Sequence, residues 1–404
     1  MSGSGKSQFR DVLANRPFRK VWIVGLIAAI GDQIFPICAT ILLINQGEGA
    51  TAISILMSVR AIAFISIAPI GGVWVDRLPK NKVIVFGAIV RAMLCVGVFM
   101  LGDEASLISL AFFVLIMGVT EGFSGPAGRA ILPNLLDHEL LQSANALGAM
   151  TGRIASISGP GIAALIAALI EPRYGFLLTA AGFLFAAFHL RDLPRATSNQ
   201  ERQSFVSEIR GGLAYIKQTR WMFVTMVILA LQVSILFGAE MVLLPVITND
   251  VFDTTKIYPI AIASLSAGSL VSAYFAARIN VENRGRISFL SWIFLSALLI
   301  GLIFPINIPF LLICYFIGGI ATQPMGVFWA TALQREVPVE LRGRVMSLDS
   351  TLTSALVPFG MMLAGPMSEA VGERTYLASC LILFLILSVI ALKTPGVARF
   401  SSSR

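Results

Sequence analysis

The chain has 404 residues, of which 56% are hydrophobic and only 13% carry a charge, and its mean hydropathy is +0.84. This composition lies well outside the range of soluble domains. The formal net charge of +8 comes with no basic stripe or reader motif, so it does not indicate a nucleic-acid partner. We therefore interpret the chain as an integral membrane protein.

Apolar runs of about 20 residues alternate with short polar connections, and each run is long enough to cross a hydrocarbon core about 30 Å thick. Twelve such runs predict an all-α membrane protein with twelve transmembrane helices. The predicted spans are residues 20–45, 51–75, 82–102, 106–129, 142–170, 174–190, 221–249, 257–279, 286–304, 308–333, 344–371 and 375–393.

Basic residues indicate the orientation of these spans. If the N-terminus is cytoplasmic, all but six of the 30 Lys and Arg residues fall in the termini and inner loops, as the positive-inside rule requires. The other six are Arg173, Lys256 and Arg374 outside, and Arg60, Arg91 and Arg153 within spans. We expect both termini in the cytoplasm, and a first span that is retained because no short apolar segment with a cleavage site precedes it.

The longest inner connection separates six spans from six and predicts the domain boundary. Its second half is either an amphipathic helix along the inner surface, with Phe205, Ile209, Leu213 and Ile216 on one face, or a solvated linker. The predicted parts are a tail (1–19), a six-helix half (20–190), the linker (191–220), a second six-helix half (221–393) and a tail (394–404).

Two similar stretches indicate an internal repeat. PNLLDHELLQS begins at Pro133 and PVELRGRVMSL at Pro338, about 205 residues later, and a Gly-Pro pair follows each at nearly the same distance. We infer two six-helix halves related by duplication. The Gly-Pro pairs are expected to bend a span and allow close packing; these residues are Gly159, Pro160, Gly365 and Pro366.

Residues that bind metals or act as nucleophiles are scattered. The four cysteines occur singly along apolar spans, and the two histidines have no companion at ligand spacing. We therefore expect neither a cofactor nor a metal site, and no enzymatic activity.

The loop between the second and third spans carries a recognisable motif. Gly72-x-x-x-Asp76-Arg77-x-x-Lys80-x-Lys82 resembles the signature loop of the major facilitator superfamily, G-x-x-x-D-R-x-G-R-[RK], with Pro79 in place of the usual glycine and Asn81 at one basic position. The resemblance implies a transporter with two pseudo-symmetric halves of six helices. Within the superfamily, the chain is most similar to bacterial drug and siderophore exporters, which include macrolide efflux proteins and the enterobactin exporter.

The resemblance to that branch rests on Gly31-Asp32, Arg91, GPAGRAILPNLL from residue 125, Gly159-Pro160, and VPVELRGRVMSL from residue 337. Many drug antiporters also carry an arginine inside the fourth span, whereas Arg129 lies only at its inner end. Their scheme of proton coupling therefore does not transfer directly to this chain.

The signature loop predicts an inner gate. In this interpretation, the carboxylate of Asp76 interacts with the partial positive charge at the N-terminal end of the span that begins near Gly343 in the other half. The alternative is that the loop only anchors the protein at the inner surface. The candidate gate residues are Gly72, Asp76, Arg77, Lys80, Lys82, Arg129, Arg342 and Arg344.

Placing an acidic residue inside a span costs free energy, so each such residue is expected to have a structural or functional role. Four acids qualify: Asp32, Glu121, Glu240 and Asp349. The resemblance implies that spans 1, 4, 7 and 10 line a central cavity, which would give the first three access to water. We predict Asp32, Glu121, Glu240, Arg60 and Arg91 as proton-coupling residues, Asp32 first; structural ion pairs are the alternative.

The same four spans also supply aromatic and amide side chains suited to a bulky amphipathic solute. The candidate cavity residues are Gln33, Phe35, Phe123, Gln232, Phe237, Gln323 and Trp329. For the aromatic residues, lipid-facing positions or packing are the alternative.

These features together predict a monomeric, proton-coupled antiporter in a bacterial cell membrane. Its partners would be protons, the lipid bilayer and an amphipathic small molecule such as a drug, a siderophore or a natural product. One alternative is lysophospholipid flipping or solute uptake by the same fold. The other is a sensor or enzyme without transport, for which the sequence offers neither an appended soluble domain nor a convergent site.

Overall fold

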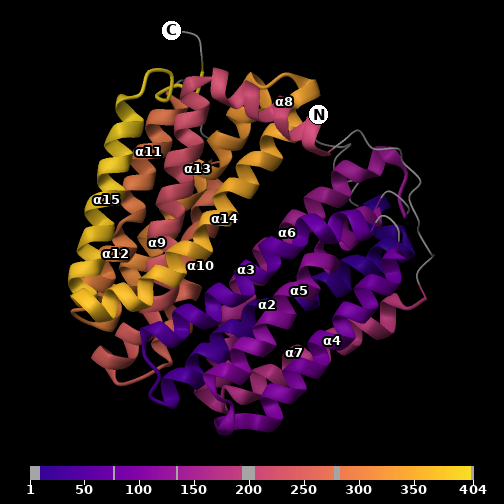
Figure 1. The fold of residues 1–404 in the computed structure, drawn as a ribbon, viewed down its shortest axis with the longest axis vertical. Helices are drawn as coiled ribbons and strands as arrows, with labels where there is room; N and C mark the ends of the chain where they lie inside the picture. Colours follow the sequence, from indigo (N-terminus) through magenta and orange to yellow (C-terminus); the bar gives the residue numbers. More distant parts are fainter. Residues whose placement is uncertain (1–9, 76–77, 133–134, 193–204, 277–282, 402–404) are drawn as a thin grey trace. The chain divides into compact units, whose positions relative to one another are not determined.

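A computed structural model describes residues 10–75, 78–132, 135–192, 205–276 and 283–401 (Figure 1). Within these ranges the regular structure is helical, with no strand. The longer helices are α2 (Arg16–Asn45), α3 (Ala50–Val75), α4 (Lys80–Leu101), α5 (Leu107–Ala130), α6 (Leu141–Leu169), α7 (Arg173–Leu190), α8 (Phe205–Gln218), α9 (Arg220–Phe252), α10 (Ile257–Ala276), α11 (Arg284–Leu295), α12 (Ala297–Ile303), α13 (Ile308–Glu336), α14 (Val339–Val371) and α15 (Glu373–Lys393).

Each predicted span coincides with a helix, and the ninth coincides with two. Among the described residues, ten helical segments are long and apolar enough to cross a membrane, with α11 and α12 together forming one of them. The apolar part of α10, Ile257–Ala273, is shorter, and α14 is not in the set. The all-α membrane fold is confirmed, while a crossing by α10 and by α14 stays a prediction.

Two helices begin earlier than their apolar runs. The backbone N–H of Phe18 donates to the side chain of Asn15 (3.0 Å), so Asn15 is the N-cap of α2 and the helix starts at Arg16 rather than residue 20. Helix α14 starts at Val339, just after Pro338, rather than at residue 344. Hydropathy misses these turns because polar residues form helix as readily as apolar ones.

The ninth span is interrupted where the sequence predicts one continuous helix. Ser296 separates α11 from α12, with a ψ of −10°, and its hydroxyl donates to the carbonyl oxygen of Ile293 (2.6 Å). This side-chain bond competes with the helical pattern of the backbone. A serine amid apolar residues was too weak a signal to predict the break.

Contacts divide the chain into two compact units, residues 1–47 with 59–200 and residues 48–58 with 201–404. In the first unit, α2 packs against α6 and α7, and α4 packs against α5 and α7. In the second, α9 packs against α14 and α15, α11 and α12 pack against α13 and α15, and α10 packs against α13.

The helix pairings in one unit repeat those in the other. By their contacts, α2 corresponds to α9, α4 to the α11–α12 pair, α5 to α13, α6 to α14 and α7 to α15. Helix α3 correspondingly contacts α5 as α10 contacts α13, since Gly118 meets the backbone of Arg60. The pseudo-symmetry inferred from the sequence repeat is therefore confirmed in the helix packing.

The first turns of α3 belong to the second unit, where they contact α14. The backbone N–H of Gly365 donates to the hydroxyl oxygen of Ser54 (2.8 Å), and a Cβ atom on Gly365 would lie 2.5 Å from the carbonyl oxygen of Ala50. The carboxylate of Glu369 accepts from the backbone N–H of Thr51 (2.9 Å). An acid from α14 thus caps the positive N-terminal end of α3.

Helix α8 packs against α14 within the second unit. Gly212 lies against Leu348 and Arg344, and the Tyr215 hydroxyl donates to the carbonyl oxygen of Glu336 (2.8 Å). Ile216 is buried. The apolar face of this amphipathic helix therefore has a protein partner along part of its length.

Close helix packing in the first unit depends on Gly159 of α6. A Cβ atom at this position would collide with the Cβ atom of Gln33 on α2 and lie 3.3 Å from the carbonyl oxygen of Ile30. Two residues later, a Cβ atom on Gly161 would meet nothing within 4 Å. The two glycines therefore form a matched pair for measuring the effect of the close approach.

We expect Gly159→Ala to lower the free energy of unfolding by about 1–3 kcal/mol, because the added methyl group overpacks the contact with α2. Gly161→Ala should leave stability unchanged or slightly raised, since alanine favours helix over glycine. Thermal unfolding in detergent, followed by tryptophan fluorescence, measures both. An equal loss in the two variants would show that α6 and α2 do not depend on this approach.

Candidate functional site

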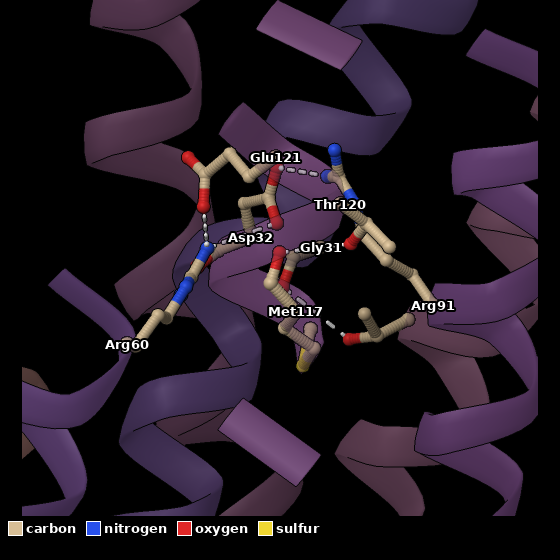
Figure 2. A network of polar contacts seen from close by, with 8 residues as sticks. Gly31, Asp32, Arg60, Arg91, Met117, Thr120 and Glu121 are labelled. Carbon is tan, nitrogen blue, oxygen red and sulfur yellow. Dashed lines mark hydrogen bonds and ion pairs between the residues drawn. The ribbon is translucent and has the colours of Figure 1, made fainter. Parts of the chain in front are cut away.

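Asp32, in the middle of α2, lies at the centre of an ion-pair network in the first unit (Figure 2). One carboxylate oxygen is 3.2 Å from Nη2 of Arg60 on α3, and the other is 3.4 Å from Nη1 of Arg91 on α4. The same Nη2 atom of Arg60 is 3.1 Å from the carboxylate of Glu121 on α5. Four helices therefore each contribute one charged side chain.

Small residues bring these helices close enough for the pairs to form. Gly118 lies one turn before Glu121, and a Cβ atom there would collide with the carbonyl oxygen of Arg60. Gly31 precedes Asp32 and lies against Thr179 of α7. Because a larger residue at either glycine would separate the helices, local packing positions the charges.

The network is balanced in charge, with two carboxylates and two guanidinium groups. The side chains of Asp32 and Glu121 are 25% and 32% exposed, whereas that of Arg91 is only 8% exposed. Arg91 also lies over the ring of Phe183, 5.1 Å from its centroid, a favourable cation–π position. The two acids thus keep some exposed surface, while the arginine is fixed among helices.

The other two acids predicted from the sequence lie in the second unit and do not join this network. Glu240 of α9 is 2% exposed and lies beside Tyr315 of α13. Asp349 of α14 accepts a hydrogen bond from the indole N–H of Trp329 (3.0 Å). Across the described residues, no group of three or more His, Cys, Asp or Glu side chains is placed to hold a metal ion.

Three candidate cavity residues are buried against other side chains. The Gln232 amide donates to the carbonyl oxygen of Phe384 (3.0 Å) and to Ser388 (2.7 Å) on α15. Phe35 packs edge-to-face against Phe176, and Trp329 against Trp221 and Phe400. These contacts are typical of packing and do not support contact with a solute.

Four other cavity candidates keep some exposed surface; they are Gln33, Phe123, Phe237 and Gln323. Gln33 directly follows Asp32, and Phe123 lies two residues after Glu121. Successive helical residues project about 100° apart, and the Cβ atom of Gln33 faces Gly159 of α6, so neither side chain shares a helix face with the neighbouring acid.

The candidate gate residues are described only in part. Lys80 is fully buried, Lys82 is exposed and Arg344 partly exposed, and Arg342 donates to the carbonyl oxygen of Val337 (3.5 Å). Asp76 and Arg77 lie outside the described residues, as do the details of Gly72 and the side chain of Arg129. The gate therefore stays a prediction.

Sequence reasoning missed Glu369 and the pairing of Glu121 with Arg60. Glu369 lies in the last turns of α14, a position that reads as an ordinary surface acid. The feature of the sequence that could have identified Glu369 is its spacing from Gly365. The two residues are one helical turn apart, so both lie on the face of α14 that meets α3. The sequence left all three arginines within spans as possible partners of the acids, and only the fold assigns both Asp32 and Glu121 to Arg60.

Removing one charge from the network should lower the stability of the protein more than removing two opposite charges. We expect Arg60→Gln to lower the free energy of unfolding by about 1–3 kcal/mol, less than for a fully buried pair because the acids are partly exposed. Adding Glu121→Gln should restore part of this loss, since Asp32 and Arg91 then balance. Thermal unfolding of the single and double variants measures the coupling.

The matched control is the exposed pair Arg173 and Glu171, separated by 2.6 Å. The same cycle there should show almost no coupling, because exposed pairs contribute little. Additive effects of Arg60→Gln and Glu121→Gln would mean that the two side chains act independently.

Comparison with known proteins agrees with these features. A family model described as Major Facilitator Superfamily matches residues 21–360. The multidrug efflux pump Tap of Mycobacterium tuberculosis is 23% identical over 92% of this chain and 91% of its own length. Macrolide efflux protein A of Streptococcus pyogenes is 20% identical over 88% of this chain and 90% of its own.

Solved structures show the same fold. The nucleoside transporter NupG superposes with a TM-score of 0.70 at 15% identity, over 93% of this chain and 98% of that one. A D-xylose–proton symporter gives a TM-score of 0.72 at 12% identity, over 95% and 99% of the two chains. The protein is thus a multi-pass membrane transporter rather than an enzyme, and the chain belongs to the Major Facilitator Superfamily.

Proposed function

We propose that this transporter exports an amphipathic small molecule from a bacterial cell in exchange for protons, with both termini in the cytoplasm. The direction is supported by its similarity to a multidrug efflux pump and a macrolide efflux protein over most of their length. The coupling is supported by the partly exposed ion-pair network around Asp32, which is the observation that carries the proposal.

A proton can drive this network between two arrangements. Protonation of Asp32 removes the carboxylate that pairs with Arg91, while Arg60 keeps its pair with Glu121. Arg91 then lacks a counter-charge inside a helix bundle, which is costly. Binding or release of a proton by Asp32 therefore changes which arrangement of these helices has the lower free energy.

The reverse step follows from the same contacts. When Asp32 loses its proton, its carboxylate again pairs with both arginines and the balanced network is restored. A transporter that exposes Asp32 alternately to the two sides of the membrane would therefore bind a proton on one side and release it on the other. A solute that binds only one arrangement would be moved in exchange.

The expected solute follows from the partly exposed side chains of the helices that carry the acids. Gln33 of α2 offers an amide and Phe123 of α5 an aromatic ring, and the carboxylates of the same two helices attract positive charge. This combination suits a bulky amphipathic molecule, and a basic amine would gain most from it. The drug-efflux relatives favour the same class.

We expect Asp32→Asn to abolish the accumulation of solute driven by an imposed pH difference, because the amide cannot bind and release a proton. Glu121→Gln should reduce it less, since Asp32 keeps both arginines. Passive exchange of solute should persist in both variants. The assay uses inside-out membrane vesicles, a fluorescent amphipathic amine and a radiolabelled macrolide as probes, and matched protein abundance.

Glu104→Gln, at an exposed position, serves as the control and should transport like the parent. Full pH-driven accumulation in both Asp32→Asn and Glu121→Gln would overturn carboxylate coupling at this network. Accumulation of neither probe by the parent, together with pH-driven movement of labelled lysophospholipid, would favour lipid transport instead.

A further inference from the structure

Glu240 is an acid that the ion-pair network does not explain. It lies about 12 residues before the end of α9, about 18 Å along the helix axis, and is 2% exposed. Its Oε1 atom is buried and has no hydrogen-bond partner among the described residues. A carboxylate in this position would be deprived of water, and at least one of its oxygen atoms would accept no hydrogen bond.

The neighbour of Glu240 is a tyrosine from another helix, which in turn lies close to a second tyrosine. Tyr315 of α13 is fully buried beside it, and the Tyr315 hydroxyl likewise has no hydrogen-bond partner among the described residues. Tyr258 of α10 is 4% exposed and lies close to Tyr315. Tyrosine hydroxyls stabilise a carboxyl group by hydrogen bonding but provide no positive charge.

The helices packed against α9 present no cation to Glu240 among their described residues. Asp349 of α14 is bonded to Trp329, and on α15 Tyr376 and Cys380 interact with each other. Helix α12 has no titratable residue, and α8 faces Arg344 and Leu348 of α14. The surroundings therefore favour a neutral group at Glu240.

The internal repeat shows how the two units differ. Glu240 lies about one helical turn further along α9 than the position that corresponds to Asp32 on α2. The positions that correspond to Arg60 and Arg91, about 205 residues later, hold Leu265 and Ser296. The second unit has therefore kept an acid on its first helix without the two arginines that neutralise the acid in the first.

We propose that Glu240 holds a proton in this conformation and is a second proton-binding site of the transporter. The inference rests on the proposed proton coupling and extends it to the second unit. In the network, four charges balance without a proton; at Glu240, only a proton removes the charge. The two acids thus differ in how they are neutralised within the same conformation.

This difference has a consequence for the transport cycle. A transporter that binds protons at both acids should move more protons per solute than one that relies on Asp32 alone. Glu240 would release its proton when a rearrangement of α9, α10 and α13 admits water, because hydration favours the ionised form.

The test is infrared spectroscopy of the full-length protein in lipid nanodiscs at pH 7, where exposed carboxyl groups, with reference pKa values of about 4, are ionised. The parent should show the C=O stretching band of a protonated carboxyl group. Glu240→Gln should lose this band, and Tyr315→Phe should shift it by removing the neighbouring hydroxyl. Asp32→Asn should keep it.

Stability provides a second measurement. Glutamine is close in shape to a protonated glutamic acid, so Glu240→Gln should unfold at the same temperature as the parent. Asp32→Asn should unfold at a lower temperature, because it leaves Arg91 without its carboxylate. Glu240→Gln should also lower the number of protons moved per solute in proteoliposomes, measured with an internal pH dye and the probe amine.

Absence of the band in the parent at pH 7 would overturn the proposal, and so would a band that survives in Glu240→Gln. A band that sodium ions abolish at constant pH would assign the site to a metal cation instead. If Asp32→Asn stops pH-driven transport but the parent lacks the band, proton coupling stands and only this inference fails. If the band behaves as expected but neither acid affects transport, the proposed coupling fails.

Discussion

The cost of placing charge among membrane-crossing helices governs the polar chemistry of this protein. Each ionisable group there must be paired, kept neutral or placed near a helix end. Asp32 and Glu121 meet this requirement through Arg60 and Arg91. Glu369 meets it at the N-terminal end of α3, and Glu240, in our proposal, meets it by keeping a proton. The sites where charge changes are therefore few, and their locations are set by packing.

Close packing is what makes the pairing feasible. Guanidinium and carboxylate groups meet at 3.1–3.4 Å only when their helices approach closely, and glycines occupy the points of closest approach. Gly118 allows α5 to reach α3 beside Arg60, and Gly159 allows α6 to reach α2 beside Gln33. The same residues that determine helix packing thus position the candidate coupling site, so substitutions far from any charge are expected to affect it.

The two units share a pattern of helix pairing and differ in their polar residues. Apolar surfaces and small residues suffice to reproduce the packing of α2 with α6 and α7 in that of α9 with α14 and α15. A few polar positions then distinguish the units, such as Arg91 in the first and Ser296 at the corresponding position in the second. The serine interrupts its span, whereas the arginine completes an ion-pair network. The two units thus share a pattern of packing while their polar chemistry differs.

Long apolar runs in the chain specify the all-α membrane fold and the number of spans to within two helices, and carboxyl groups within these runs identify the acids that need an explanation. Long apolar runs have few alternatives in a bilayer, because helices satisfy every backbone polar group internally. Only the tertiary structure decided the partners. The rotation of each helix and the depth at which helices cross turned Gln232 towards α15, joined Arg60 to two acids and left Glu240 beside Tyr315. Spacing along the chain does not specify these relations, because they arise from contacts between helices distant in sequence.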